Sequence, residues 1–381
     1  MNTGLLRTLS LLVMLLLAAG CASPVRYPAA GEFLGDKIVT TVDSPEAAYY
    51  LEHTLAGRRN NPALDAEIER LHREAAADRL PNRAELAAIA GKFSTDFAAL
   101  FFADRVAREK GNAAFQARFK HHFDHPADAD PVLAEGCGRY VVLFAPGWDY
   151  RANGHVTGAD LRRPRELVAA LGLDCRQIAY DPNGAVEANA RDIRVAVEEA
   201  AASGKQVVIV GASSAGPAIH VALSGFAERG ATAPAAWINL GGILQGSPLL
   251  EAAAKPPQSL LFKTYLWFKG WDRRAVESMN ATRSRARFAR LKLPESTLVV
   301  NYVGLSLSGS LSKYSRGKYP LLRSEGPNDG LTPLADIIAP GGLTLIAPTS
   351  DHFLAEDPLI DRKTVALAKA VITLLEEKRR S

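Results

Sequence analysis

Short apolar runs alternate with amphipathic stretches over about the C-terminal two-thirds of the chain. The runs are rich in Val, Ile and Leu, which is typical of buried strands, and they lie at residues 140–145, 176–180, 206–210, 235–240, 297–303 and 342–347. The stretches between them favour helices, and a last helix is predicted over residues 362–379. Strands that alternate with helices in this way predict an α/β fold with a mainly parallel sheet and helices on both faces.

The N-terminal third has a different pattern. Residues 46–135 carry amphipathic segments and predict a helical region, with the clearest apolar faces over residues 62–72 and 94–118. Residues 21–45 contain Pro, Gly and Tyr with little periodicity, so we expect a tether there. The main domain is therefore predicted over residues 136–381.

One long segment, residues 249–295, interrupts the alternation between two late strands. It contains a dense apolar and aromatic stretch from Leu260 to Trp271. Two interpretations fit this stretch: a packed helix that buries its aromatic face in the core, or a lid or cap over a binding site. The pattern alone leaves both open.

Residues 1–20 have the layout of a secretory signal peptide, with an early charge at Arg7, an apolar core and small residues before Cys21. The apolar core is too short to span a bilayer. The small residues before the cysteine resemble the bacterial lipobox, which implies that Cys21 is lipidated and anchors the protein in the cell envelope. Ala22 and Ser23, in place of Asp, resemble the sorting signal of outer-membrane lipoproteins. We expect the protein to face either the periplasm or the cell surface.

Composition and charge narrow the class of partner. The formal net charge is +4 over 381 residues, and it falls by one when residues 1–20, with Arg7, are removed. Such a small charge gives no reason to expect nucleic-acid binding. The hydrophobic fraction of 48% supports a sizeable core. The sequence does not determine the oligomeric state.

A pair of serines follows the strand predicted at 206–210. The β-branched strand residues lead into a run of small residues around the pair, and a helix-compatible stretch comes next. A strand, a sharp turn and a helix in this order expose a serine Oγ above the sheet, with small residues two positions before and after it. Two registers satisfy that spacing: Ser213 with Gly211 and Ala215, and Ser214 with Ala212 and Gly216.

The string Gly-Ala-Ser-Ser-Ala-Gly-Pro-Ala-Ile at 211–219 resembles the Gly-His-Ser-His-Gly-Gly-Pro-x-Ile elbow of bacterial true lipases in the α/β-hydrolase superfamily. In that register Ser213 is the nucleophile, and the backbone N–H of Ser214 belongs to the oxyanion hole. Ala215 stands where the lipase pattern has Gly. The resemblance implies an α/β-hydrolase fold and a serine esterase or lipase that works through an acyl-enzyme, with no cofactor and no metal.

The base and the acid of a catalytic triad are expected downstream, in the order Asp then His. Asp329 lies in the Pro- and Gly-bounded loop 326–333, whose Asn-Asp-Gly-Leu-x-Pro string resembles the acid loop of lipases. His352 follows a late apolar strand and a short loop, and it is the expected base. Asp336 and Asp351 are rival acids. Asp351 is disfavoured because a residue adjacent to His352 in sequence should point its side chain elsewhere.

A second oxyanion donor is expected after the strand at 140–145. That strand ends in Pro-Gly-Trp, where Gly147 allows a close backbone approach and the N–H of Trp148 is the predicted donor. The string Ile238–Pro248 resembles the strand-end string of lipases that reads roughly Gly-x-Pro-His-x-Gly-Ser/Thr-Pro. With the elbow, the acid loop and the His loop, it extends the resemblance over about residues 138–355.

Cysteines and histidines suggest two further sites. Cys137 and Cys175 each come just before a predicted strand, and the third and fourth strands of the implied fold are parallel neighbours. The two cysteines are therefore expected at one sheet edge, where an oxidising periplasm would allow a disulfide between them. His121 and His125 share a helix face at i, i+4, but no third ligand has a recognisable spacing. A polar helix end without a metal is the favoured interpretation.

Functions from two classes, enzyme and binding protein, fit the sequence. The favoured one is a membrane-anchored serine hydrolase that cleaves carboxylic esters, with an ester or lipid as substrate. The alternatives are a non-catalytic hydrolase-fold envelope lipoprotein that acts as a binding or scaffold protein, or an acyltransferase with the same triad. Serine, aspartate and histidine in the expected order favour the enzyme.

Overall fold

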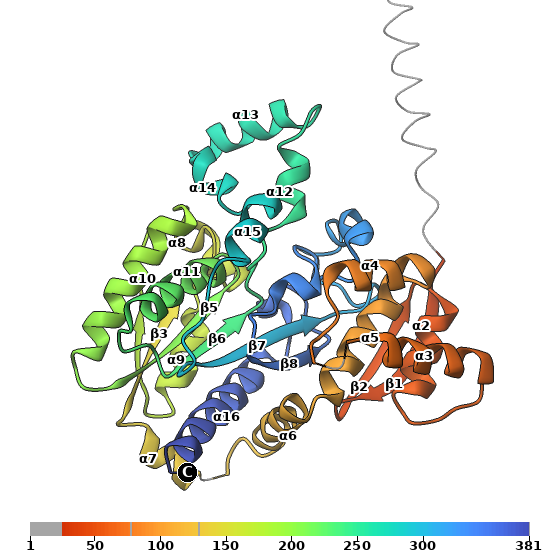
Figure 1. The fold of residues 1–381 in the computed structure, drawn as a ribbon, viewed down its shortest axis with the longest axis horizontal. Helices are drawn as coiled ribbons and strands as arrows, with labels where there is room; N and C mark the ends of the chain where they lie inside the picture. Colours follow the sequence, from red (N-terminus) through yellow and green to blue (C-terminus); the bar gives the residue numbers. More distant parts are fainter. Residues whose placement is uncertain (1–24, 77, 129, 381) are drawn as a thin grey trace, which may run out of the picture.

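The computed structural model describes residues 25–76, 78–128 and 130–380. The predicted signal peptide over residues 1–20 and the predicted lipidation site Cys21 lie outside these residues. Figure 1 shows a central sheet with helices on its faces and a group of helices that stands out from one end. None of the described helices is long and apolar enough to cross a membrane.

A parallel sheet forms the centre of the C-terminal two-thirds of the chain. Its strands are β3 (Tyr140–Ala145), β4 (Asp174–Gln177), β5 (Gln206–Ala212), β6 (Ala236–Leu240), β7 (Leu298–Leu305) and β8 (Leu343–Pro348). Among the described residues these six strands pair in the order β4-β3-β5-β6-β7-β8, and every pair is parallel. The predicted mainly parallel sheet is confirmed. The predicted positions are close except at β4, which begins and ends earlier than residues 176–180.

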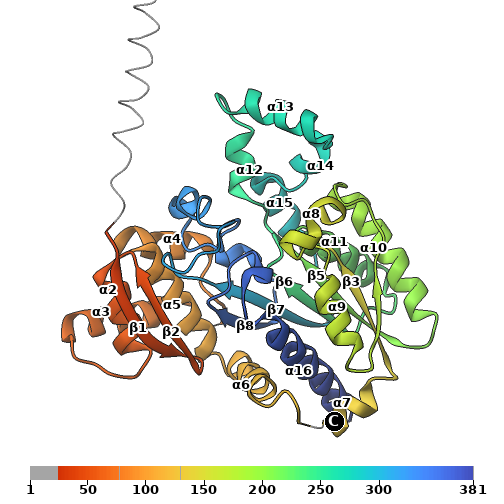
Figure 2. The same cartoon turned by 180° about the vertical axis from the view of Figure 1, so that it is seen from behind.

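Both faces of this sheet are covered, which explains why its strands are continuously apolar. Along β3, Val141 and Leu143 pack into one hydrophobic cluster, while Val142 and Phe144 pack into another on the opposite face. The first cluster includes α10 (Val186–Ala201) and α11 (Ala215–Arg229), and the second includes α6 (Lys110–Asp124), α9 (Arg162–Ala169) and α16 (Ile360–Arg380). Figures 1 and 2 show these helices on either side of the strands.

The segment predicted as a tether is largely a β-hairpin, so that part of the prediction is wrong. The strands β1 (Tyr27–Phe33) and β2 (Asp36–Val42) pair antiparallel across a two-residue loop of Leu34 and Gly35. Both loop residues have positive φ, as a type I′ hairpin turn requires. Ala29, Phe33, Ile38 and Val42 are buried, and the residues between them are exposed or partly buried. The sequence pattern concealed this alternation because several of the residues are the weakly apolar Ala, Gly and Thr.

The predicted helical region before the sheet is present. It comprises α2 (Pro45–Tyr49), a π-helical turn (Tyr50–Thr54), α3 (Pro62–Glu74), α4 (Arg83–Lys92), α5 (Thr95–Arg108), α6 and α7 (Pro131–Gly136). Ser44 and Asn82 cap α2 and α4 through their side chains. Helix α5 and the hairpin share a hydrophobic cluster with Val303 of β7 and Ile346 of β8. The N-terminal region therefore packs directly on the last strands of the sheet.

The insertion between β6 and β7 forms four helices: α12 (Pro248–Ala253), α13 (Ser259–Lys269), α14 (Arg273–Glu277) and α15 (Ala281–Phe288). Figures 1 and 2 show α12 to α14 standing away from the body of the molecule. Trp267 and Phe268 on α13 are 81% and 80% exposed, and within α13 only Leu266 is buried. The aromatic stretch is therefore not packed into the core, which leaves the lid or cap interpretation.

Other short elements complete the described chain: α8 (Tyr150–Thr157) and 3-10 turns at Tyr319–Glu325, Leu334–Ile337 and Leu354–Glu356. Within the described residues Cys137 and Cys175 are both free cysteines, contrary to the predicted disulfide. The reason is local. Cys175 lies inside β4, opposite Val142, whereas the Cys137 Sγ donates to the carbonyl of Leu171, ahead of that strand.

Candidate active site

Ser213 occupies the sharp turn between β5 and α11. Its φ is +51°, in the left-handed region that a non-glycine residue rarely adopts, and its N–H donates to the carbonyl of Leu240 at the end of β6. A Cβ atom at Gly211 would lie 2.1 Å from Cδ1 of Ile219, so a larger residue there would require the Ile219 side chain to move. These constraints hold Ser213 in the geometry of a nucleophile elbow.

The structure also decides between the two serine registers. Ser214 has ordinary right-handed helical backbone angles and is the N-cap of α11, so the strained position belongs to Ser213. Gly216 is needed for a separate reason. A Cβ atom there would lie 2.7 Å from the backbone of Gly242, where α11 approaches the loop after β6.

The three predicted triad residues lie together. His352 Nε2 is 2.9 Å from Ser213 Oγ, and His352 Nδ1 is 2.7 Å from Asp329 Oδ2. The side chains of His352 and Asp329 are 5% and 1% exposed, so solvent does not compete for the bond between them. Because Asp329 orients Nδ1, Nε2 is directed at the serine hydroxyl.

The carboxylate of Asp329 is fixed on its other side as well. Its Oδ1 accepts hydrogen bonds from the backbone N–H groups of Leu331 and Thr332, both at 2.9 Å. The rival Asp351 is engaged elsewhere, because it accepts from the N–H groups of Ser312 and Phe353. These contacts identify Asp329 as the partner of His352.

The other rival acid, Asp336, belongs to an ion pair away from the base. Its carboxylate lies 2.9 Å from the guanidinium of Arg285 and 4.0 Å from that of Arg83. Burial raises the pKa of Asp336, while the two arginines oppose that shift. Asp336 therefore has a structural partner and no contact with the triad.

Two residues that sequence reasoning did not single out hold the acid loop against the loop after β6, and a third fixes that loop in turn. Thr332 Oγ1 donates to the carbonyl of Gly246, and Ser247 Oγ donates to the carbonyl of Leu331, at 2.8 and 2.6 Å. Asn239 accepts from the N–H of Gly242 and is fully buried. The resemblance of the 238–248 string to lipases marked this segment. That segment 238–248 supports the Asp329 loop becomes visible only in the structure, where the two segments lie side by side.

The predicted oxyanion loop lies next to the nucleophile. A Cβ atom added to Gly147 would be 3.6 Å from the Cβ of Ser213. The N–H of Gly147 already donates to the carbonyl of Ala159, at 2.7 Å, so the donor that remains at this turn is the N–H of Trp148. The N–H of Ser214 precedes the first turn of α11, where N–H groups have no acceptor within the helix. Both predicted donors therefore flank Ser213.

A large apolar cavity opens at the triad. It has a volume of about 1040 Å³ and is lined by Ser213 and His352 at one point. From there it extends between the sheet and the helices on one face, where its wall includes Val142, Val208, Ile238, Leu367, Ala368 and Val371. This volume is at the upper end of what small-molecule sites have. The lining favours a ligand with a long apolar part.

The insertion contributes to the mouth of the same cavity. Tyr265 of α13 and Trp271 line it together with Trp148 of the oxyanion loop. The ring of Trp271 makes edge contacts with both, with ring centroids 5.3 Å from Trp148 and 5.8 Å from Tyr265. The exposed helix α13 is therefore anchored at the entrance to the site.

Comparison with solved structures shows the fold of this chain. No family model and no curated protein sequence matches the chain. Among solved structures, a metagenomic carboxyl esterase matches with a TM-score of 0.51 and 21% identity, over 64% of this chain and 76% of that one. The chain has the α/β-hydrolase fold. A lipase from Bacillus licheniformis in its mature form is also similar, with a TM-score of 0.47 and 19% identity, over 60% of this chain and 88% of the lipase.

The α/β-hydrolase fold is consistent with the position of the site. In this fold the nucleophile follows a central strand at the carboxyl edge of the sheet, and β5 is central in the observed order. Asp329 and His352 follow β7 and β8. The loops that carry the three side chains therefore meet at one edge of the sheet because their strands are parallel.

Proposed function

We propose that this protein is a serine hydrolase that cleaves carboxylic esters. The observation that carries the proposal is the hydrogen-bonded series Ser213, His352 and Asp329, which opens into an apolar cavity. A serine, a histidine and a buried carboxylate in this geometry perform acyl transfer on several unrelated folds, so the geometry supports the reaction independently of fold.

The reaction follows from the hydrogen bonds. His352 Nε2 takes the proton of Ser213 Oγ while that oxygen bonds to the ester carbonyl carbon. The tetrahedral intermediate collapses, the C–O bond to the alcohol breaks, and His352 returns the proton to the leaving oxygen. Water then attacks the acyl-enzyme by the same route and releases the acid. Asp329 keeps the hydrogen on Nδ1 and stabilises the charged imidazole throughout.

The oxyanion of both intermediates is assigned in this proposal to the N–H groups of Trp148 and Ser214. They flank Ser213 from the loop after β3 and from the start of α11. Loss of one such donor typically costs about 2.7–4 kcal/mol of transition-state stabilisation.

The cavity and the insertion support a lipid-like ester as substrate. An acyl chain bound at Ser213 would extend along the apolar wall towards α16. The exposed side chains of α13 include Leu260, Leu261, Trp267 and Phe268, beside the mouth of the cavity. Large apolar side chains exposed together on one helix are typical of a surface that contacts lipid or a partner.

Hydrolysis of p-nitrophenyl butyrate by the purified protein tests the proposal. Ser213→Ala should abolish turnover. Ser214→Ala should retain most of it, because Ser214 contributes a backbone N–H that alanine also has. Absence of turnover by the wild type on esters of every chain length would favour the binding or scaffold function.

We also propose that Cys21 carries a lipid anchor in the bacterial cell envelope, at the outer membrane. Strand β1 begins six residues after Cys21, and six residues span at most about 20 Å. A lipid on Cys21 would thus keep the hydrolase domain close to the bilayer that holds its substrate. Cys21→Ser should move the protein from the membrane fraction to the soluble fraction with its esterase activity intact. Membrane retention of that variant would locate the attachment elsewhere.

A further inference from the structure

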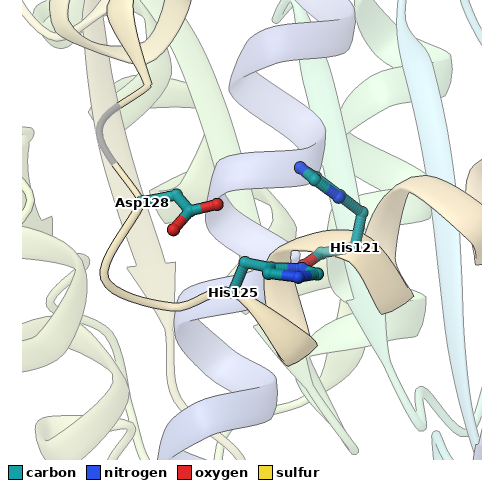
Figure 3. A group of neighbouring side chains, drawn as sticks. All are labelled: His121, His125 and Asp128. Carbon is teal, nitrogen blue, oxygen red and sulfur yellow. The ribbon is translucent and has the colours of Figure 1, made fainter.

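The end of helix α6 brings three metal-ligating side chains together. His121 and His125 lie one turn apart on the same helix face, with ring centroids 5.0 Å apart. Asp128 follows in the turn after the helix. One ligand atom from each of the three residues lies within 4.8 Å of the other two. Figure 3 shows the carboxylate of Asp128 and the ring of His121 facing the same space beside the ring of His125. The predicted polar helix end therefore has the third ligand that the sequence spacing did not reveal.

One imidazole is already oriented for a metal. His125 Nδ1 lies 3.0 Å from the backbone carbonyl oxygen of His121. A carbonyl oxygen only accepts, so the hydrogen is on Nδ1 and the lone pair is on Nε2. This tautomer and this backbone contact are the arrangement that metal-bound histidines usually have.

The backbone that carries the ligands is fixed from α16. Lys369 is a buried residue, with 5% of its surface exposed. Its ammonium group donates to the carbonyl oxygens of Pro126 and Asp128, at 2.8 and 3.3 Å. The guanidinium of Arg362 donates to the carbonyl oxygens of Phe123 and Asp124. These contacts from α16 hold the helix end and the following turn through backbone carbonyls, without using the side chains of His121 or Asp128.

We propose that His121, His125 and Asp128 bind one divalent transition-metal ion, with Zn²⁺ as the best match. Two imidazole nitrogens and one carboxylate oxygen are common zinc ligands, and a tetrahedral ion keeps its fourth position for water. Bonds of 2.0–2.1 Å place tetrahedral ligand atoms roughly 3.3 Å apart, so the side chains close by about 1.5 Å around the ion. All three residues are exposed, which leaves room for this closure and gives the ion a direct path.

The position of the site indicates a structural role. Asp128 leads through α7 into the beginning of β3, whereas Ser213 follows the end of β5. The ion would therefore lie at the opposite edge of the sheet from the triad, and it would tie the end of α6 to the connection that enters the sheet. The proposal does not depend on the proposed esterase function.

Zinc binding by the untagged protein tests the site. Titration in competition with a chromophoric zinc chelator should give one ion per chain. His121→Ala, His125→Ala and Asp128→Asn should each weaken binding at least about tenfold, since loss of a supporting residue alone commonly costs 10–100-fold. Zinc should raise the melting temperature of the wild type and not that of the variants, because an ion that binds the folded state stabilises it.

Two control variants distinguish specific zinc binding by these three residues from nonspecific zinc binding by surface carboxylates and histidines. Asp124→Asn removes a carboxylate from the same helix turn, where it pairs with Lys120, and His53→Ala removes a histidine from another region. Both should bind zinc like the wild type. The proposal is overturned if the wild type does not bind zinc, or if the controls weaken binding as much as the ligand variants do.

Discussion

Filling the inner end of the cavity should shorten the acyl chain that the protein accepts. Ala368 on α16 lines the cavity and is 8% exposed. Ala368→Phe adds a phenyl ring, which would displace roughly three methylene groups of a bound chain. Since each buried methylene contributes about 0.8 kcal/mol, the lost binding is about 2.4 kcal/mol, or roughly 60-fold in kcat/KM. Esters that are too short to reach α16 should keep their kcat/KM.

The assay compares p-nitrophenyl esters from acetyl to palmitoyl on the wild type and on Ala368→Phe. The acetyl and butyryl esters should keep their kcat/KM, and the ratio of long-chain to short-chain activity should fall by the stated factor. The melting temperature should change little, because the ring enters space that is already open. A melting temperature several degrees lower, with an equal loss on every ester, would show that Ala368 is packed against its neighbours and that no acyl chain reaches it.

Three further predictions test separate parts of the account. Asp329→Asn should lower kcat by about 10⁴-fold, because asparagine favours the wrong histidine tautomer, whereas Asp351→Asn should be mild; the reverse order would assign the acid to Asp351. Replacing Trp267 and Phe268 with serine should lower activity on emulsified long-chain esters far more than on soluble short ones, without lowering the melting temperature, because both side chains are exposed; equal losses on the two substrates would argue against a lid. Burial, together with a nearby arginine, lowers the pKa of His220 to about 4, below the 6.5 expected when unfolded. The unfolded chain therefore takes up a proton on His220 below pH 6.5, whereas the folded chain does so only near pH 4. The free energy of unfolding should fall by about 3 kcal/mol over this range. Urea unfolding across that range should show a smaller loss for His220→Leu, and identical curves would contradict the assignment.

The features that were predictable from sequence are those set by local chemistry. Four β-branched residues before Gly211 and Ser213 indicated a strand that enters a tight turn. The positions of Asp329 and His352 after late strands were sufficient to place them at one edge of a parallel sheet. In each case the residue types and their spacing reflect a constraint of the backbone, so one sequence shows them.

The features that were missed depend on contacts between distant segments. The hairpin was hidden because Ala29 and Val42 alternate with weakly apolar residues, and because Val39 is exposed on the outer face. The disulfide prediction assumed that Cys175 precedes its strand, and it lies within β4. The proximity of Asp128 to His121 and His125 depends on a turn that Lys369 holds from the far end of the chain.

The support of the acid loop by Thr332 and Ser247 was beyond sequence reasoning for the same reason. The two residues donate to the carbonyls of Gly246 and Leu331 across 86 and 84 positions. Hydroxyl residues of this kind are common in loops, and their type alone indicates no partner. Their role becomes visible only once the strand order brings the loops together.

The most direct test of the central claim is labelling with a fluorophosphonate, which reacts with an activated serine, followed by peptide mapping. We predict stoichiometric labelling of the wild type on Ser213 and no labelling of Ser213→Ala. His352→Ala should react at a strongly reduced rate, because His352 Nε2 removes the proton of Ser213 Oγ. Labelling on Ser214, or an unlabelled wild-type protein, would contradict the claim that this triad is a working nucleophile.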